Sequence, residues 1–337
     1  MSKPLNVAVL GATGAVGQEF LRLFTDRKFP VGELKLLASP RSAGVEIEHE
    51  GKKHVVEAVS AEAFHGVDVA FFSAGASRSR EWAPAATEAG ALVVDNSSAF
   101  RMHPDVPLVV PEVNWDAVKP TDKLIANPNC SAIIMLMAVA PLRKLGTIKR
   151  IIVSTYQSAS GAGAAAMREL EEQTRTVLAG GEAKPEVFPH KYAFNLFSHN
   201  TAIGDNGYNE EENKVVEESR KILGMPELRI NPTCVRVPVL RAHSESITVE
   251  FEGAAPCVEC VRETLAASPG VRVVDDRANN VFPMPLDASG IEDVLVGRIR
   301  QDISDPNSLS LFVAGDQLLK GAAQNAVQIA ERYFGLG

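Results

Sequence analysis

The segment around Cys130 carries the clearest chemical signal in the sequence. It reads Ala-Asn-Pro-Asn-Cys-Ser and follows a short apolar stretch of strand length, residues 123–126. Pro128 interrupts that strand, Asn129 is a favourable N-cap, and the apolar residues 131–145 predict a helix. The sequence therefore places the thiol of Cys130 where a strand ends and a helix begins.

A thiol in the first turn of a helix lies beside unpaired backbone N–H groups and the positive end of the helix dipole. Both favour the thiolate over the thiol, and the thiolate is the nucleophile. The alternative is a buried structural cysteine, since a cysteine outside a disulfide usually packs as a small hydrophobic residue. Cys130 is therefore a nucleophile only if other segments supply suitable partner groups.

Two segments of the second half supply such groups. The first lies at the end of a predicted strand over 150–157 and reads Gln-Ser-Ala-Ser-Gly-Ala-Gly from Gln157 onward. The side-chain amide of Gln157 is suited to orient a substrate carbonyl. The second runs from Arg236, which suits bidentate capture of a carboxylate, to His243, which exchanges protons near neutral pH. Alone, the first segment is a glycine-rich turn, and a single histidine at a strand end is more often structural.

A glycine-rich turn near the N-terminus indicates a dinucleotide site. The apolar run 5–10 leads into Gly11-Ala-Thr-Gly14-Ala-Val-Gly17, and a helix is predicted over 16–26. Strand, glycine turn and helix is the context that makes a glycine pattern meaningful. The spacing is GxxGxxG rather than GxGxxG, yet the glycines still allow a tight turn and close approach of a pyrophosphate to the helix start.

The residues after the next predicted strand, 33–38, favour NADP(H) over NAD. An NAD-specific fold usually carries an acidic residue there for the ribose 2′-hydroxyl, whereas this chain has Arg41 beside Ser42. An arginine with a hydroxyl neighbour suits a 2′-phosphate. The alternative is an ordinary exposed loop arginine. In the second half, the backbone of Ser160 and Gly161 lies in a turn of small residues that a cofactor can approach closely.

Bulk properties are those of a cytoplasmic enzyme. The 337 residues suffice for two domains, and a net charge of −8 gives no basic surface for nucleic acid or an anionic membrane. No signal peptide is recognised, and the apolar helix from residue 131 is too short to span a bilayer. We expect Cys257 and Cys260 to be two helix residues without function, because a structural zinc site needs four ligands and no second pair exists. No metal site is predicted.

The order of predicted elements divides the chain into two α/β domains. Alternating strands and helices over 1–129 predict a Rossmann-type domain with a parallel, doubly wound sheet, completed by a C-terminal helix over 317–337. Residues 130–316 have longer, more alternating strands, which predict an α+β domain with a mixed sheet. The segment 180–206 is polar, rich in Gly and Pro, and predicted to be a long irregular loop.

In order and spacing, these motifs resemble the aspartate-β-semialdehyde dehydrogenase family along the whole chain. The family's glycine motif matches Gly11–Gly17, its nucleophile motif Asn127–Cys130, its glutamine motif Gln157–Gly163, and its Arg-to-His motif Arg236–His243. The resemblance implies a fold of two such domains, in which residues 130–316 form the catalytic and dimerisation domain. It also implies a homodimer, with a tetramer left open. It also implies NADPH-dependent reductive dephosphorylation of L-aspartyl-4-phosphate to L-aspartate 4-semialdehyde, a step toward lysine, methionine, threonine and isoleucine.

The resemblance also implies a role for individual residues. Cys130 matches the acyl-thioester nucleophile, His243 the acid/base, and Gln157 the residue that orients the substrate. The implied substrate-binding residues are Gln157, Arg236 and Glu211, and the implied phosphate-binding residues are Arg101, Lys214 and Asn129. The positions matching NADP contacts are Gly11, Thr13, Gly14, Ala15, Val16, Arg41, Ser42, Ser160, Gly161 and Gln317. On the residues alone, the charges around Glu211 and Lys214 would be a solvated helix face.

Three alternatives remain open. N-acetyl-γ-glutamyl-phosphate reductases share the fold and the thiol, but tend to carry Gly and Tyr where this chain has Asn129 and Ser131. A short-chain reductase or epimerase needs a Tyr-x-x-x-Lys, and no tyrosine here has a lysine four residues later. A catalytically silent NADP-binding sensor would keep the glycine motif without needing Cys130, Gln157, Arg236 and His243 together.

Overall fold

The chain folds into two compact units, which we describe separately. The computed structural model describes residues 3–336. One unit runs from the N-terminus to Asn129 and resumes at Ala322, and the other spans Cys130–Gly321. The C-terminal helix α9 (Gln324–Phe334) thus belongs to the first unit, whereas Gln317 belongs to the second.

The first unit is built on a six-stranded sheet in which every paired strand is parallel. The strand order is β5-β2-β1-β6-β7-β8, which confirms the predicted doubly wound arrangement. The strands are β1 (Leu5–Leu10), β2 (Val31–Ala38), β5 (Glu57–Ala58), β6 (Val69–Phe72), β7 (Leu92–Asp95) and β8 (Leu124–Ala126). The central strands are buried on both faces, which explains their continuous apolar sequences.

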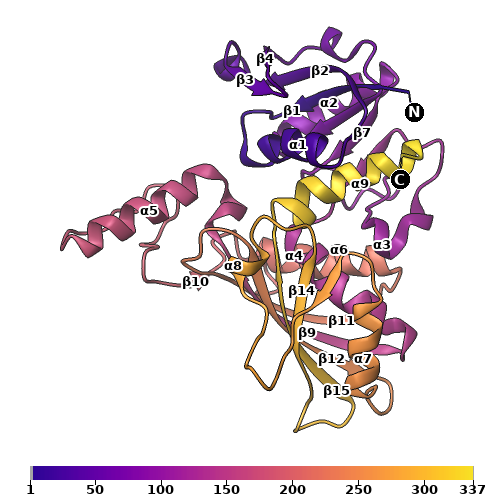
Figure 1. Ribbon diagram of the computed structural model, residues 1–337, viewed down its shortest axis with the longest axis vertical. Coiled ribbons are helices and arrows are strands. Elements are labelled where there is room, and N and C mark those ends of the chain that lie inside the picture. The colour runs from indigo at the N-terminus through magenta and orange to yellow at the C-terminus, as the bar shows by residue number, and fades with distance from the viewer. Residues whose placement is uncertain (1–2, 337) are drawn as a thin grey trace. The chain divides into compact units, whose positions relative to one another are not determined.

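Helices cover this sheet and recruit the chain's C-terminal end. They are α1 (Ala15–Asp26), α2 (Ala76–Glu88), the short α3 (Pro111–Asn114) and α9, and Figure 1 labels each of them. Helix α9 packs against α1 and α3. Arg27, just after α1, donates from Nε and Nη2 to the two carboxylate oxygens of Glu331, at 2.9 and 2.6 Å. This bidentate pair ties α9 to the end of α1.

A small hairpin in the first unit was not predicted. Strands β3 (Glu46–His49) and β4 (Lys52–Val55) pair antiparallel around Glu50 and Gly51. Both turn residues have positive φ, 49° and 73°, as a type I′ turn requires. The strands are polar and largely exposed, so no hydrophobic alternation marked them in the sequence.

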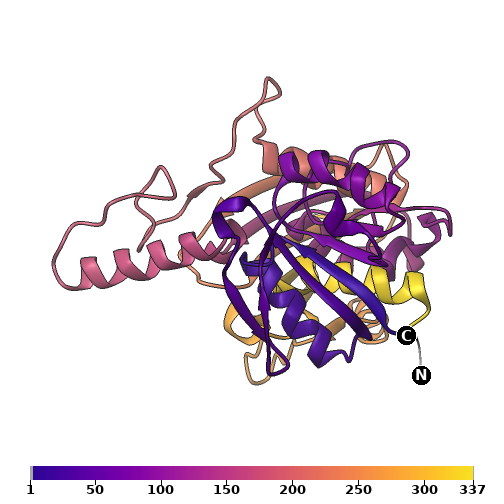
Figure 2. The same cartoon turned by 90° about the horizontal axis from the view of Figure 1, so that it is seen from above.

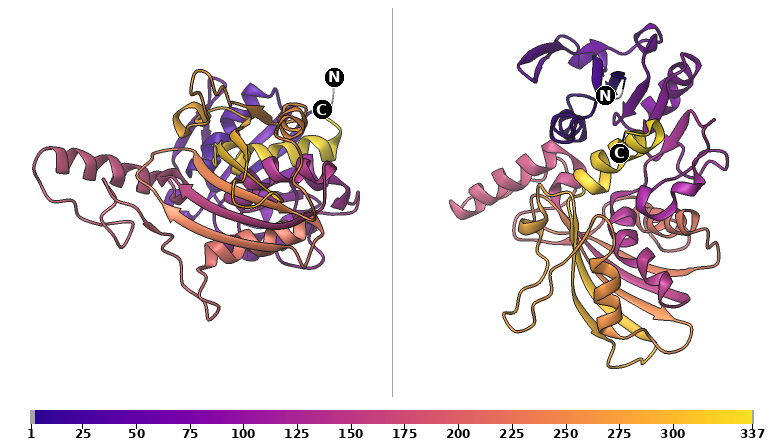
Figure 3. Two further views of the ribbon diagram at one scale, coloured as in Figure 1. Left: turned by 90° about the horizontal axis from the view of Figure 1, so that it is seen from below. Right: turned by 45° about the vertical axis from the view of Figure 1, so that its right-hand side comes forward.

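The second unit contains a seven-stranded mixed sheet, which confirms the predicted change of sheet type. Its order is β10-β11-β9-β12-β15-β14-β13, and its twist is visible in Figure 3. The strands are β9 (Ile148–Gln157), β10 (Phe197–Ser198), β11 (Arg229–Arg236), β12 (His243–Phe251), β13 (Val271–Val273), β14 (Val294–Gln301) and β15 (Ser308–Gly315). Strand β9 pairs parallel with β11 and antiparallel with β12.

The helices of this unit are α4 (Cys130–Val139), α5 (Ala164–Leu178), α6 (Glu210–Leu223), α7 (Val258–Ala266) and the short α8 (Pro285–Ala288). From Ser131 onward every residue of α4 is buried, in keeping with a helix that is apolar on all sides. The predicted helix over 131–145 gives way at Ala140 to a 3₁₀ turn, Ala140–Lys144. Pro141 explains the change, because it has no backbone N–H and disfavours helical conformation in the residue before it.

Helix α5 runs outward from the end of β9 (Figure 1), and the segment 180–206 returns beside it in an extended path toward α6 (Figure 2). This segment is irregular, as predicted, but it is closely tied to α5. The carboxylate of Glu169, on α5, accepts backbone N–H groups of Glu186, Val187 and Phe188 at 2.9–3.2 Å. The buried carboxylate of Glu169 therefore fixes the path of residues 186–188.

The prediction for the Cys257–Cys260 pair was only partly right, since Cys260 lies in α7 as expected. Cys257 is the N-cap of α7 rather than a helix residue, and its sulfur is joined to that of Cys260 in a disulfide. The three-residue spacing across the first helical turn holds the two Cα atoms 5.2 Å apart, a separation that a disulfide can bridge.

Among residues 3–336, no helix is long and apolar enough to cross a membrane. Over the same range, His, Cys, Asp and Glu side chains form no group of three or more that could hold a metal ion.

Candidate active site

Cys130 is the first residue of α4, as the sequence predicted, and its side chain is partly exposed. The other cysteine outside the disulfide, Cys234, is fully buried, and burial raises the pKa of its thiol. The two thiols therefore differ in their exposure to solvent. Cys130 lies at a helix start that favours the thiolate, whereas Cys234 stays protonated.

Gln157 ends β9 and lies directly against the start of α4. Its Nε2 donates to Ser131 Oγ at 2.7 Å and to Glu211 Oε1 at 3.0 Å. Because Ser131 follows Cys130, the first bond attaches the amide to the residue next to the thiol. The Oε1 atom of Gln157 is buried and has no hydrogen-bond partner among the described residues.

Arg236 ends β11 and pairs in register with Gln157. Its Nη1 donates to the carbonyl oxygen of Ser158 at 2.7 Å, and its Nη2 lies 2.9 Å from Nε2 of His199. The ring of Phe188 packs against the guanidinium, 5.3 Å from its central carbon. Nε is buried and, within residues 3–336, makes no hydrogen bond. Burial lowers the pKa of Arg236, but the group stays charged at any physiological pH.

His243 begins β12, and its two ring nitrogens have different surroundings. Nδ1 accepts from the backbone N–H of Ser158 at 3.1 Å, and Ser158 Oγ lies at the same distance. A nitrogen that accepts an N–H carries no proton, so the ring proton of the neutral imidazole is on Nε2. Burial, followed by the charge of Arg236, lowers the pKa of His243 to about 3, so the ring is neutral at pH 7.

The Nε2 atom of His243 has no hydrogen-bond partner within the described part of the chain. Gly161 lies beside it, and a Cβ on that glycine would come 2.9 Å from the ring carbon Cε1 and 3.0 Å from Nε2. Glycine at position 161 therefore keeps the proton-bearing edge of the ring accessible. The residue before His243, Ala242, has a φ of 69°, a strained conformation for a residue with a Cβ.

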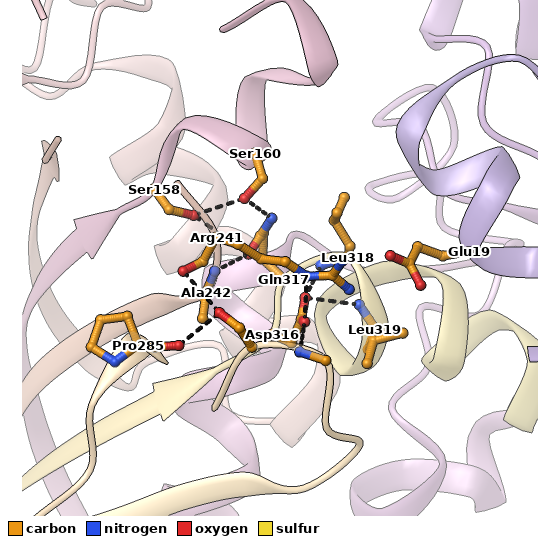
Figure 4. A network of polar contacts seen from close by, with 12 residues as sticks. Glu19, Ser158, Ser160, Arg241, Ala242, Pro285, Asp316, Gln317, Leu318 and Leu319 are labelled. Carbon is orange, nitrogen blue, oxygen red and sulfur yellow. Dashed lines mark hydrogen bonds and ion pairs between the residues drawn. The ribbon is translucent and has the colours of Figure 1, made fainter. Parts of the chain in front are cut away.

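Ser160 and Gln317, both predicted to contact the cofactor, are joined by a hydrogen bond between their side chains (Figure 4). Ser160 Oγ also lies 3.0 Å from Ser158 Oγ, and Gln317 Oε1 accepts the backbone N–H of Ala242 at 3.0 Å. In this arrangement the two side chains fix Ser158 and Ala242, the residue before His243. Their predicted contact with NADP stays a prediction.

Glu211 and Lys214 lie in the first turns of α6, which begins with a capping box formed by Asn209 and Glu212. The carboxylate of Glu211 is buried, accepts from Gln157, and lies 3.6 Å from the ammonium nitrogen of Lys214. These charges are therefore not the solvated helix face that the residues alone suggested. Glu211 faces the active-site amide, and Lys214 is partly exposed beside it.

The remaining predicted site residues lie in the first unit. Arg101 is buried; its Nε donates to the carbonyl oxygen of Asn127 at 2.9 Å and its Nη2 to that of Asn96 at 2.8 Å. Asn127 in turn accepts from Asn325 of α9 at 2.7 Å. Arg101 thus supports the turn that ends in the buried Asn129.

The glycine turn of the first unit has the close packing that a dinucleotide site needs. Gly11 has a φ of 94°, and a Cβ there would lie 2.9 Å from the backbone of Ser73. A Cβ on Gly17 would lie 2.3 Å from the carbonyl oxygen of Gly11. Helix α1 begins at Ala15, and its N-cap, Gly14, has no side chain to cap the first N–H groups, which leaves them for an anion.

Arg41 and Ser42 form part of a 3₁₀ turn, Pro40–Ser42, directly after β2, and the guanidinium of Arg41 is exposed. The other predicted cofactor positions, Thr13 and Val16, lie in the glycine turn and the first turn of α1.

Sequence reasoning missed Ser158 and His199. Ser158 acts through its backbone as well as its hydroxyl, which residue types do not reveal. His199 lies in the segment 180–206, which was predicted to be loop. The aromatic residues of that segment, Phe188, Tyr192 and Phe197, were the available signal, because clustered aromatic residues in a presumed loop indicate packing.

Comparison with known proteins identifies the family. Residues 6–121 match the model of the semialdehyde dehydrogenase NAD binding domain, and residues 139–320 match that of the semialdehyde dehydrogenase dimerisation domain. Aspartate-semialdehyde dehydrogenase of Synechocystis sp. is 57% identical, with 98% of each chain covered. The chain belongs to the aspartate-semialdehyde dehydrogenase family.

The chain is also similar to other members of the aspartate-semialdehyde dehydrogenase family. The enzyme of Bacillus subtilis is 46% identical over 98% of both chains. A crystal structure of aspartate semialdehyde dehydrogenase II from Vibrio cholerae, complexed with ASA, is also 46% identical, with a TM-score of 0.94 over 98% of both chains. These comparisons confirm the resemblance found in the sequence, and they do not favour the reductase, epimerase or sensor alternatives.

Proposed function

We propose that this member of the family reduces L-aspartyl-4-phosphate to L-aspartate 4-semialdehyde with NADPH, through a thioester on Cys130. The reverse reaction oxidises the semialdehyde and requires phosphate. The relatives' names support the substrate, and the site geometry supports the route. The product would feed synthesis of lysine through diaminopimelate, and of methionine, threonine and isoleucine.

One observation carries the proposal. Several buried polar atoms of the second unit have no partner among the described residues, and three of them belong to predicted site residues: Gln157 Oε1, Arg236 Nε and His243 Nε2. An unsatisfied buried polar atom is costly, so native proteins keep few of them. Here the three site atoms are an acceptor, a cationic donor and a neutral donor at one end of the sheet. A substrate with a carboxylate and a reacting carbonyl would supply their missing partners.

The nucleophilic step uses the start of α4. The thiolate of Cys130 would attack the acyl carbon of aspartyl phosphate, forming the C–S bond as the carbonyl electrons move to oxygen. Return of those electrons breaks the C–O bond to phosphate and leaves a thioester. Backbone N–H groups at the helix start are suited to stabilise the transient oxyanion, an effect of about 3 kcal/mol per donor in tested enzymes.

His243 would act at the substrate oxygen. Its Nδ1 is engaged by Ser158, so the proton is held at Nε2 on the side left open by Gly161. When the thioester is reduced, a hydrogen bond from Nε2 stabilises the oxyanion of the thiohemiacetal, and His243 transfers protons to and from that oxygen. Gln157, fixed by Ser131 and Glu211, would orient the same substrate.

The substrate's charged groups match the charges at the site. We propose that Arg236 binds the α-carboxylate through Nε–H, and that Glu211 contacts the substrate from the adjacent start of α6. Arg101, Lys214 and Asn129 are proposed to bind the phosphate. Two cations suit a dianionic leaving group, which a water-dependent aldehyde dehydrogenase does not have.

The first unit fits a dinucleotide. We propose that the turn from Gly11 to Val16, including Thr13, Gly14 and Ala15, holds the pyrophosphate, and that Arg41 and Ser42 hold the 2′-phosphate of NADP. Gly161 is proposed to contact the cofactor through its backbone, and Ser160 and Gln317 to support that contact. When bound, NADPH supplies the hydride for reduction of the thioester.

The match to the dimerisation domain supports a dimer. We propose a homodimer, with a tetramer of two such dimers as the second possibility. The cytoplasmic location inferred from composition stays a prediction.

The test is the initial rate of NADP reduction by the purified protein with L-aspartate semialdehyde, with and without phosphate. Phosphate-dependent reduction supports the proposal. Turnover of N-acetylglutamate semialdehyde instead would reassign the substrate. Binding of NADP without turnover of either aldehyde would contradict an enzymatic role.

A further inference from the structure

His199 is the first residue after β10 and lies beside the end of β11, because Phe197 pairs in register with Arg236. The side chain is partly buried and contacts two neighbours. Its Nε2 lies 2.9 Å from Nη2 of Arg236, and its Nδ1 lies 3.2 Å from Oγ1 of Thr201.

The chemistry of the two partners fixes the state of the ring. A guanidinium can only donate, so Nε2 of His199 accepts and carries no proton. The ring proton is therefore on Nδ1, where it is directed at the hydroxyl oxygen of Thr201. His199 is a neutral imidazole that serves as an acceptor for a buried cation.

The surrounding charges agree with this state. Burial lowers the pKa of His199 to about 4, and the positive charges of Arg236, on β11, and Lys214, on α6, act in the same direction. Glu211, also on α6, opposes the shift and is outweighed. At neutral pH the acceptor on Nε2 is thus fully available.

We propose that His199 is a positioning residue for substrate recognition, which holds the guanidinium of Arg236 so that its Nε–H is presented to the α-carboxylate of the substrate. The inference rests on the proposed function, because it concerns the same site. It assigns His199 to neither the proton transfers nor the thioester chemistry.

The hydrogen bonds of Arg236 support this role. Of its five N–H groups, one on Nη1 is taken by Ser158 and one on Nη2 by His199. Two anchors on different nitrogens fix the rotation of the guanidinium within its plane, and the ring of Phe188 covers one face of that plane. Without His199, a single hydrogen bond and a ring contact would hold a long, flexible side chain.

The segment that carries His199 is itself fixed, which a positioning role requires. Glu169 holds the backbone of Phe188, and Gln173, one turn later on α5, accepts the N–H of Tyr192 at 2.7 Å. The hydroxyl of Tyr192 donates to the carbonyl oxygen of Val237, next to Arg236. Helix α5 and β11 therefore hold the segment 184–199 from both sides.

The test compares three variants of the full-length protein. His199→Leu removes the acceptor, His199→Gln keeps one on the amide oxygen, and His190→Leu is the control. His190 lies on the same segment but is exposed and contacts the ring of Phe197 rather than Arg236. Each variant is assayed with L-aspartate semialdehyde, with phosphate, and with 3-aminopropanal, the same aldehyde without its carboxylate.

We expect His199→Leu to raise the KM for L-aspartate semialdehyde about tenfold, since it removes a hydrogen bond to a charged group. The KM for phosphate and the kcat/KM for 3-aminopropanal should stay at wild-type values. His199→Gln should recover most of the loss, and His190→Leu should match wild type. In an Arg236→Ala background, His199→Leu should have no further effect.

Equal losses with both aldehydes would assign His199 a general structural role and overturn the proposal. So would an unchanged KM for L-aspartate semialdehyde in His199→Leu, or full additivity with Arg236→Ala. A wild-type protein that does not oxidise L-aspartate semialdehyde would instead refute the proposed function, which keeps the two failures distinct.

Discussion

The two units bring functional groups together in different ways. In the first unit the glycine turn and the start of α1 come from one stretch, Gly11–Gly17, and their relation is local. In the second unit Gln157, Arg236 and His243 come from three strands aligned by register, with Gln157 opposite Arg236 and Ser244 opposite Tyr156. The hydrogen bond from Gln157 to Ser131 then links these strands to the start of α4, where Cys130 lies. A site formed by one stretch of sequence can be recognised from its residue types. A site formed by the register of several strands can be recognised only once the fold is known.

The arginines of the two units also differ in their electrostatic environments. Arg41, in the first unit, is exposed and available to a phosphate from solvent. Arg236, in the second unit, is buried. Its Nη1 donates to Ser158 and its Nη2 to His199, whereas its Nε has no hydrogen-bond partner among the described residues. We therefore expect a change at Arg236 to affect substrate recognition, and a change at Arg41 to affect the choice of cofactor.

The largest expected effect separates the two cysteines outside the disulfide. Cys130→Ala should lower kcat by roughly three orders of magnitude or more, because it removes the nucleophile. NADPH binding, measured by fluorescence titration, should be unchanged. Cys234→Ala is the matched control and should keep turnover, since that thiol is buried and protonated. Retained turnover in Cys130→Ala would eliminate the thioester mechanism.

A change at Arg41 tests the first unit. Arg41→Glu should reduce the ratio of kcat/KM for NADP to that for NAD roughly tenfold or more, because a carboxylate repels the 2′-phosphate and accepts from a 2′-hydroxyl. Lys119→Glu makes the same charge change at another exposed position of this unit and should leave the ratio unaltered. If the two variants behave alike, Arg41 is an ordinary surface residue.

A smaller effect is expected at Lys214. Lys214→Ala should raise the KM for phosphate in the oxidative direction roughly fivefold, since the lysine is partly exposed and its charge is partly screened. Lys184→Ala, at an exposed lysine of the segment 180–206, provides the comparison. Identical phosphate saturation curves for wild type and Lys214→Ala would exclude a phosphate-binding role.

The smallest effect concerns stability and pH. The folded-state pKa of His199 is lowered from 6.5 to about 4, so between these values the unfolded chain binds more protons than the folded one. Stability therefore rises with pH in that window, with a slope of up to about 1.4 kcal/mol per pH unit from this residue. His199→Gln should make the curve of unfolding free energy against pH shallower between pH 4 and 6.5. An unchanged slope would mean that His199 titrates normally.

Local patterns made the fold class predictable from the sequence. The run from β1 through the glycine turn to α1 was recognised because strand, turn and helix follow one another directly. The start of α4 at Cys130 was recognised for the same reason. The β3–β4 hairpin was missed, because its Glu50-Gly51 turn resembles none of the favoured turn dipeptides and its strands are polar.

Positions whose roles depend on distant partners were harder to predict. The position of His199 beside Arg236 could be recognised only from the pairing of β10 with β11 in the structure. Ser158 matters through its backbone, which donates to His243 and accepts from Arg236. Ser160 and Gln317 lie in the expected region, but their mutual hydrogen bond, across 157 residues of sequence, could not be inferred from residue types.

The most direct test of the central claim is to trap the covalent intermediate. Enzyme mixed with NADP and L-aspartate semialdehyde, without phosphate, should produce a stoichiometric burst of NADPH and an aspartyl adduct on the peptide that contains Cys130. Added phosphate should release the adduct and restore turnover. Steady turnover without phosphate, or a burst with no adduct on Cys130, would contradict the account.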